Sequence, residues 1–217
     1  DIDNVKNIFV QQGMGDGGLA TGASLWVDWN LREKSGNNFY KTVYFGPSFS
    51  EEKIFEKLDC EKNFEILKKE DSEGEIANLI SQNKIIGRFH GPMEWGPRAL
   101  GNRSIIASAT DAEINKTLND RLSRTEFMPF APIIMEEFAS DYFVGYEPSH
   151  VASRFMTVTY DVDPKKRDII PAVVHVDGTA RPQVVRKEDN PSLHAVLSNY
   201  YDITGIPVLI NTSFNIH

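Results

Sequence analysis

The sequence has little of several features that would assign its function at once. Its single cysteine, Cys60, cannot form an internal disulfide, which predicts a reducing, cytoplasmic location. No apolar run approaches the roughly 18 residues that span a bilayer, and no signal peptide is recognisable. Paired metal-binding cysteines, HExxH and the phosphate loop GxxxxGK[ST] are also missing from the sequence. We therefore expect a protein with no membrane partner and no P-loop nucleotide site.

Net positive charge is also lacking. The chain has 23 basic and 31 acidic residues, a formal charge of −8, which argues against a general nucleic-acid-binding protein, because contacts with phosphates need a basic surface. Nine of the thirteen lysines precede residue 85, whereas nine of the ten arginines lie between Arg88 and Arg186. Because guanidinium groups grip phosphate or carboxylate with two hydrogen bonds, the second half is predicted to carry the site.

Hydrophobic periodicity and turn residues predict short strands mixed with helices. We expect strands at residues 5–10, 83–88, 104–110, 155–162, 172–176, 183–185 and 206–215, the fifth and sixth forming a hairpin. We expect helices at 18–31, around 54–58, around 76–80, around 114–122 and at 192–200, with a linker at 34–38 and a solvated turn at 69–75. The pattern indicates an α/β fold with a mixed twisted sheet and flanking helices.

Four loops rich in Arg, Asn and hydroxyl groups recur near predicted strand ends: GPRALGNRS, SRTEFMPFAP, VDGTARPQ and NTSFN. Each has an ordinary structural explanation when taken alone. Arg98 can pair with Glu94, and Arg124 with Glu126, while Asn211 can satisfy turn backbone. Together the loops predict a cleft lined with guanidinium, hydroxyl and amide groups, which suits an anionic phosphorylated ligand.

The motifs EWGPRALGNRSI, RTEFMPFAP, HVDGTARPQ and TGIPVLINTSFN, in this order, resemble the C-terminal half of the carbamoyltransferases typified by NodU and the antibiotic O-carbamoyltransferases. IFVQQGMGDGGLATGASLW resembles the end of that family's N-terminal domain. The resemblance implies two parts, residues 1–34 from an ASKHA/Kae1-like domain and residues 35–217 with a YrdC/Sua5-like fold. With no initiator Met and an end directly after a predicted strand, the chain is expected to be a fragment.

The resemblance also implies a reaction. The C-terminal domain activates carbamoyl phosphate with ATP and Mg²⁺ to carbamoyl adenylate, and the N-terminal domain transfers the carbamoyl group to an acceptor hydroxyl. The acceptor is a sugar, an antibiotic or related small molecule, or a glycan, and a homodimer is possible. The N-terminal domain of the family holds a divalent metal such as iron through two histidines and an aspartate. Asp16 stands at the aspartate position, with the histidines expected upstream.

Site residues follow from the motifs. Glu94 is expected to hold an arginine in place, and Met128 stands where the family often has an arginine, a loss that Arg121 and Arg124 can offset. The predicted catalytic residues are Arg98, Arg103, Ser104, Arg124 and His175. The predicted ATP- or carbamoyl-phosphate-binding residues are Arg88, Arg121, Arg154, Arg181, Asn211 and Ser213.

Two other functions stay open from the sequence. One is a non-catalytic YrdC-like module that binds a nucleotide or RNA, which the acidic balance and the lack of aromatic–basic interleaving disfavour. The other is a relative of threonylcarbamoyl-adenylate synthases, which share the adenylate chemistry but use bicarbonate and threonine. A comparison of carbamoyl phosphate with those two substrates separates the second alternative from carbamoyl transfer.

Overall fold

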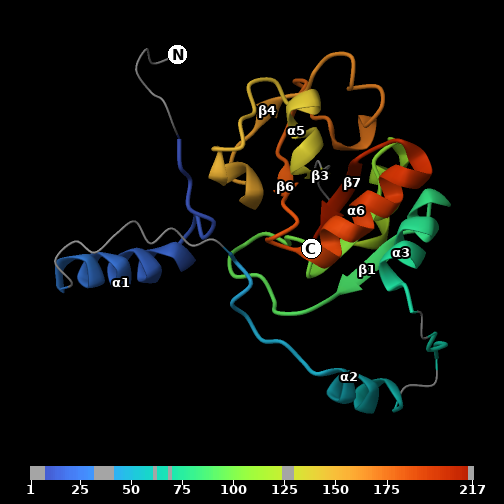
Figure 1. Ribbon diagram of the computed structural model, residues 1–217, viewed down its shortest axis with the longest axis horizontal. Helices are drawn as coiled ribbons and strands as arrows, with labels where there is room; N and C mark the ends of the chain where they lie inside the picture. The colour runs from blue at the N-terminus through green and yellow to red at the C-terminus, as the bar shows by residue number, and fades with distance from the viewer. Residues whose placement is uncertain (1–7, 32–41, 61–62, 68–69, 124–129, 215–217) are drawn as a thin grey trace.

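A five-stranded mixed sheet forms the centre of the molecule (Figure 1). The computed structural model describes residues 8–31, 42–60, 63–67, 70–123 and 130–214. The strands are β1 (Ile86–Phe89), β2 (Arg103–Ser108), β3 (Ala131–Met135), β6 (Gln183–Val185) and β7 (Val208–Thr212), in the order β1-β2-β7-β3-β6. β7 runs antiparallel to β2 and β3, and β3 runs parallel to β6. The predicted mixed sheet is confirmed, with the C-terminal strand at its middle.

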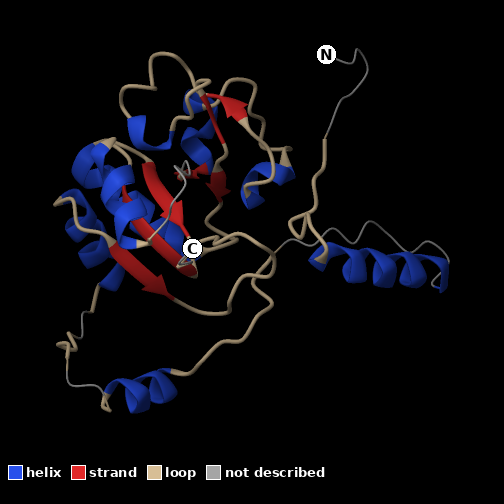
Figure 2. Cartoon of the chain, turned by 180° about the vertical axis from the view of Figure 1, so that it is seen from behind, coloured by secondary structure: helices blue, strands red, loops and turns tan. Residues whose placement is uncertain are grey.

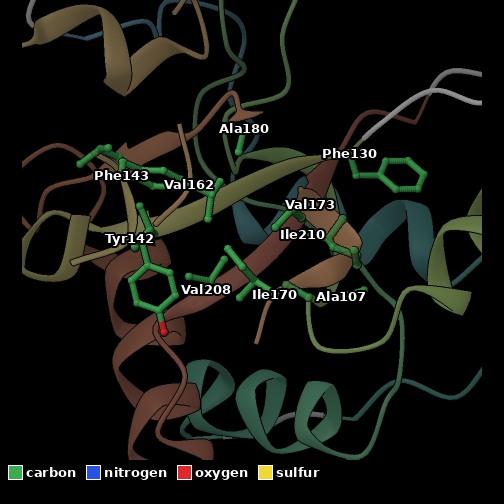
Figure 3. Packing of buried hydrophobic residues seen from close by; sticks show 14 of the residues in the cluster. Ala107, Phe130, Tyr142, Phe143, Val162, Ile170, Val173, Ala180, Val208 and Ile210 are labelled. Carbon is green, nitrogen blue, oxygen red and sulfur yellow. The ribbon is translucent and has the colours of Figure 1, made fainter. Parts of the chain in front are cut away.

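Helices cover both faces of the sheet. On one face Leu209 of β7 packs with α3 (Ser72–Ser81) and α6 (Pro191–Thr204). On the other face Val208 and Ile210 pack with α4 (Glu113–Arg121) and α5 (Glu136–Tyr142), as Figure 3 shows for part of this cluster. Because successive side chains of a strand point to opposite faces, the apolar run of β7 serves both layers. Each such side chain, fully buried, contributes about 2 kcal/mol of burial free energy.

Residues 143–182 form a small irregular layer that corrects three sequence predictions. It contains the 3₁₀ turns η1 (Val151–Phe155) and η2 (Pro171–Val173) and the short pair β4 (Tyr160–Asp161) and β5 (Thr179–Ala180). The predicted strands at 155–162 and 172–176 are therefore wrong over most of their length. The predicted hairpin is also wrong, since β5 pairs with β4 and β6 pairs with β3. The alternation of polar and apolar residues predicted strands that do not form here. Met156 adopts a left-handed backbone (φ 54°), and the apolar residues after Pro171 are buried by a single 3₁₀ turn.

The predicted helices near the N-terminus are confirmed as α1 (Gly17–Leu31) and α2 (Glu51–Leu58), and both lie apart from the sheet in Figure 1 and Figure 2. Neither helix buries a residue, but the segment before α1 is attached, since Thr157 Oγ1 donates to the Val10 carbonyl at 3.1 Å. Residues 8–10 do not form the predicted strand, and residues 5–7 lie outside the described residues.

Two further segment predictions have different outcomes. The solvated turn at 69–75 is wrong from Ser72 onward, where α3 begins after an N-cap bond from Gly74 N to Asp71 Oδ1. The linker at 34–38 and the domain boundary after residue 34 lie outside the described residues, so both stay predictions. Among the helices of the described segments, none is long and apolar enough to cross a membrane.

Candidate anion-binding site

The sheet topology brings the sequence motifs to one edge. β2, β3 and β6 begin at this edge, while β1 and β7 end there, as their pairing shows: Arg88 lies opposite Ser104, and Asn211 opposite Ala131. The loop GPRALGNRS therefore enters β2 beside the end of β7, where NTSFN begins, and at the same edge as β6, which begins at the last residue of DGTARPQ. Residues 124–129, which belong to the motif SRTEFMPFAP, lie outside the described residues, so the role of Arg124 stays a prediction.

Glu94 organises the loop before β2 through the backbone. Its Oε1 accepts hydrogen bonds from the amides of Leu100 (2.8 Å), Asn102 (2.7 Å) and Arg103 (3.1 Å). The arginine that Glu94 contacts is Arg103, through its backbone amide, and the Glu94 charge partly offsets the burial that lowers the pKa of Arg103. A contact of Glu94 with an arginine side chain stays a prediction. A carboxylate that accepts three amide hydrogens satisfies a tight turn whose amides cannot pair with each other.

Ser104 completes the capture of the loop amides. Its Oγ, fully buried, accepts from Gly101 N at 2.8 Å, so four consecutive amides point inward to two side chains. Gly101 is required here, because its φ is 106° and an added Cβ would lie 2.4 Å from Leu193 Cδ2. In glycine-rich phosphate loops such amides bind the anion directly. Here they are already paired within the fold, and Ser104 supports the loop, while its catalytic role stays a prediction.

Carbonyl groups of the same loop are tied to the sheet by two amide side chains. Asn211 Nδ2 donates to the Ala99 carbonyl and to Gln183 Oε1, both at 2.8 Å, and Gln183 Nε2 donates to the Leu100 carbonyl at 2.7 Å. Both side chains are 3% exposed. The remaining polar atom, Asn211 Oδ1, is buried with no hydrogen-bond partner. This unpaired oxygen lies directly beside the residue that precedes the captured amides.

Arg98 and Arg181 form the cationic part of the site. Each has a buried Nε without a hydrogen-bond partner, a feature shared with Arg88, and neither has an ion-pair partner among the described residues. Burial lowers the pKa of Arg181, and the positive charge of Arg98 lowers it further. Two partly desolvated guanidinium groups within electrostatic reach of each other are unfavourable without an anion between them. The pair is therefore suited to a phosphate or carboxylate ligand.

His175 lies within electrostatic reach of Arg181. Burial lowers its pKa, and the Arg181 charge lowers it again, while Asp177 acts in the opposite direction. Its Nδ1 lies 3.0 Å from Thr179 Oγ1, which fixes the ring orientation. The imidazole is consequently neutral near pH 7, with one nitrogen left to accept a proton or a hydrogen bond.

Arg103 is used differently from Arg98. Its guanidinium lies 3.6 Å above the centre of the Phe89 ring. Its two Nη atoms donate to four backbone carbonyl oxygens, those of Pro47, His90, Gly91 and Asn102, at 2.8–3.4 Å. This geometry occupies all four Nη hydrogens with backbone. The assignment of Arg103 to a phosphate stays a prediction, and the contacts favour a role in holding the loop.

Arg88 is also committed within the fold. It is 5% exposed, and its Nη2 donates to Ser192 Oγ at 3.0 Å, while Ser192 Oγ donates to Glu73 Oε1 at 2.5 Å. The chain of contacts joins β1 to the first turns of α6 and α3. Arg88 therefore stabilises this edge of the sheet through its contacts with α6 and α3, and direct ligand binding by Arg88 stays a prediction.

The remaining predicted arginines lie in other environments. Arg154 Nη2 pairs with Asp189 Oδ2 at 2.7 Å, a carboxylate that Arg186 also binds. Arg121 is exposed at the end of α4 and lines a surface depression with Lys84. Arg154 and Arg121 therefore have surroundings that differ from those of Arg98 and Arg181.

The last two predicted positions are Ser213 and Asp16. Ser213 is half-buried directly after β7, at the correct sheet edge. Asp16 is exposed in the turn before α1, and within the described residues no group of three His, Cys, Asp or Glu residues could hold a metal ion. The metal role of Asp16 therefore stays a prediction that depends on residues upstream.

Sequence reasoning missed three residues that hold the loop. They are Gln183, Tyr44 and Asn190; Tyr44 Oη donates to the Leu100 carbonyl at 2.8 Å, and Asn190 Nδ2 donates to Tyr44 Oη and Asn102 Oδ1. Burial raises the pKa of Tyr44 to about 12, so its hydroxyl keeps its proton. Gln183 is the last residue of the VDGTARPQ motif, so its position in that motif could have indicated a role in the site. Tyr44 and Asn190 lie outside the four motifs, and nothing in the sequence singles them out.

Comparison with known proteins gives the family. Residues 77–217 match the family model described as "Carbamoyltransferase C-terminus". The chain is 42% identical to an uncharacterized protein of Methanocaldococcus jannaschii over 97% of this chain and 40% of that protein. It is 35% identical to nodulation protein NolNO of Sinorhizobium fredii, over 97% of this chain and 31% of that protein. It is also 35% identical to nodulation protein NolO of Bradyrhizobium diazoefficiens, over 96% of this chain and 38% of that protein.

Similarity to solved structures is weaker. The crystal structure of HypF from T. kodakarensis aligns at 15% identity with a TM-score of 0.43, over 67% of this chain and 17% of that chain. A likeness of this size adds no argument about the site. The chain spans between 31% and 40% of the length of the three relatives named above.

Proposed function

Because the chain belongs to the carbamoyltransferase family, we propose that it carries the site at which carbamoyl phosphate is activated with ATP to carbamoyl adenylate. The observation that carries this proposal is the pair of guanidinium groups of Arg98 and Arg181, two like charges within electrostatic reach of each other and without an ion-pair partner among the described residues. Carbamoyl phosphate and ATP are both polyanions, and they supply the negative oxygens that this pair lacks.

The proposed reaction has two steps. Water cleaves the phosphorus–oxygen bond of carbamoyl phosphate, releasing inorganic phosphate and leaving carbamate. A carbamate oxygen then attacks the α-phosphorus of ATP and displaces pyrophosphate, which gives carbamoyl adenylate. Both steps place negative charge on phosphate oxygens, which positioned cations stabilise without forming covalent bonds.

The residues of the chain divide these tasks. Arg98 and Arg181 bind phosphate oxygens, and His175, neutral near pH 7, accepts the proton of the water. Glu94, Ser104 and the amide of Asn211 hold the loop that presents Arg98. Mg²⁺ in this proposal is bound by the phosphates of ATP, the usual manner for this ion.

Transfer completes the proposal for the whole protein. The carbamoyl group passes to an acceptor hydroxyl of a small molecule or glycan, in an upstream domain whose divalent metal, such as iron, includes Asp16 among its ligands. A cytoplasmic location and a homodimer belong to the same proposal.

The test is carbamoyl-phosphate-dependent exchange of pyrophosphate into ATP by the full-length protein. We expect Arg98→Ala and Arg181→Ala each to lower the rate at least a hundredfold, because each removes a cation from the developing phosphate charge. Lys187→Ala, which removes one exposed positive charge, is the control and is expected to stay within twofold. No exchange by the folded wild-type protein would refute the proposal, and exchange driven by bicarbonate with threonine would favour the threonylcarbamoyl alternative.

A further inference from the structure

The amide of Asn211 has a fixed orientation. Its Nδ2 faces the Ala99 carbonyl, which can only accept, and Gln183 Oε1, whose own orientation is set by the bond from Gln183 Nε2 to the Leu100 carbonyl. Reversing the Asn211 amide would set two oxygens against each other at Ala99 and again at Gln183. Asn211 Oδ1 is therefore the atom without a partner, in a side chain that is 97% buried (3% exposed).

An unpaired buried acceptor costs stability, and native structures contain few of them. Both donors of the Asn211 amide bind groups of the fold, and its acceptor can still pair with one more hydrogen-bond donor. The position of this acceptor is informative: Ala99, to which Asn211 binds, directly follows Arg98, and Gln183 lies two residues after Arg181. The unpaired oxygen therefore lies at the same sheet edge as Arg98 and Arg181, whose Nε atoms are also buried without a hydrogen-bond partner.

A ligand that satisfies all three atoms has an anionic group for the arginines and an N–H donor for the oxygen. Resting on the proposed function, we infer that Asn211 Oδ1 accepts a hydrogen bond from the NH₂ of the carbamoyl group and thereby selects carbamoyl phosphate over other acyl phosphates. Arg98 and Arg181 cannot make this distinction, because acetyl phosphate offers them the same phosphate. The methyl of acetyl phosphate matches the NH₂ in size and lacks the donor, so the oxygen stays unpaired when acetyl phosphate binds.

The experiment measures kcat/KM of the full-length protein for carbamoyl phosphate and for acetyl phosphate, in the ATP–pyrophosphate exchange assay. For the wild-type protein we expect carbamoyl phosphate to be preferred at least tenfold. Asn211→Leu replaces the amide by an apolar group of similar shape, and its preference is expected to fall to within threefold of unity. Asn211→Asp retains an acceptor oxygen and is expected to keep a preference while losing rate.

Ser104→Ala is the matched control, since it weakens the same buried loop and leaves the bonds of Asn211 in place. It is expected to lower both rates and to leave their ratio within twofold of wild type, which separates selection from loop support. A wild-type ratio near one overturns the inference even if no Asn211 variant folds, and so does an Asn211→Leu variant with the wild-type ratio. Either result leaves the proposed function standing, whereas a wild-type protein without any carbamoyl-phosphate-dependent exchange removes that function itself.

Discussion

Arg98, in the loop before β2, and Arg103, the first residue of β2, have opposite environments. Arg103 gives its Nη hydrogens to four backbone carbonyl oxygens and stacks on Phe89, whereas Arg98 has a buried Nε with no partner. The same contrast divides the site. The loop from Leu100 to Ser104 is saturated with internal hydrogen bonds, while the Arg98–Arg181 pair and Asn211 Oδ1 are not.

The difference teaches which polar groups specify structure and which await a ligand. Groups that are paired internally fix the shape of the loop, and their loss is expected to show first in stability. Groups that are buried and unpaired cost stability in the absence of a ligand, and their loss is expected to show in binding and rate. Two results would contradict this distinction. One is a substitution that removes an internally paired group of the loop without lowering the free energy of unfolding. The other is a substitution that removes an unpaired group and does lower it.

The largest effect on stability is expected from Glu94→Ala. It leaves three loop amides, those of Leu100, Asn102 and Arg103, without their acceptor, which costs about 3 kcal/mol or more in the free energy of unfolding. Glu94→Gln keeps an acceptor oxygen and is expected to lose less than half as much. Urea unfolding of the three proteins measures the difference, and a loss below 1 kcal/mol for Glu94→Ala would show that solvent replaces Glu94.

A crossed result is expected for the two arginines. Arg103→Ala removes hydrogen bonds from a charged donor to backbone and should lower stability by about 1–2 kcal/mol. Arg98→Ala removes one of two like charges and should leave stability unchanged or raise it slightly, while it weakens protection of the fold by inorganic phosphate. Thermal unfolding with and without phosphate measures both effects. Equal destabilisation by the two substitutions would remove the distinction.

The sequence predicts the saturated region less well than the sheet and the arginines. The three apolar residues 208–210 lie between turn-forming and polar residues, so their place in a short buried strand follows from the sequence. Arg98 and Arg181 follow from motif position. The partners of Glu94 could not be predicted, because a side chain that binds backbone amides depends on the path of the loop and not on the identity of the residues it binds. The strands predicted within residues 143–182 were wrong for the same reason, since the turns of this layer are set by tertiary packing.

The smallest effect concerns His175, which borders the unsaturated pair. Burial and Arg181 lower its pKa below the ordinary value of about 6.5, so the unfolded chain binds a proton that the folded protein refuses. The stability that His175 contributes is therefore present above about pH 6.5 and is lost as the pH falls toward its folded pKa. Burial lowers the pKa of His90 as well, so part of the acid loss belongs to that residue. We expect His175→Gln to flatten the decline of stability between pH 6.5 and 5 without abolishing it, as followed by urea unfolding across this range.

Because a phosphate bound between Arg98 and Arg181 would offset the positive field on His175, saturating phosphate should also shift the decline of the wild-type protein and leave that of His175→Gln in place. An unchanged pH profile for His175→Gln would place the imidazole outside the electrostatic reach of the pair.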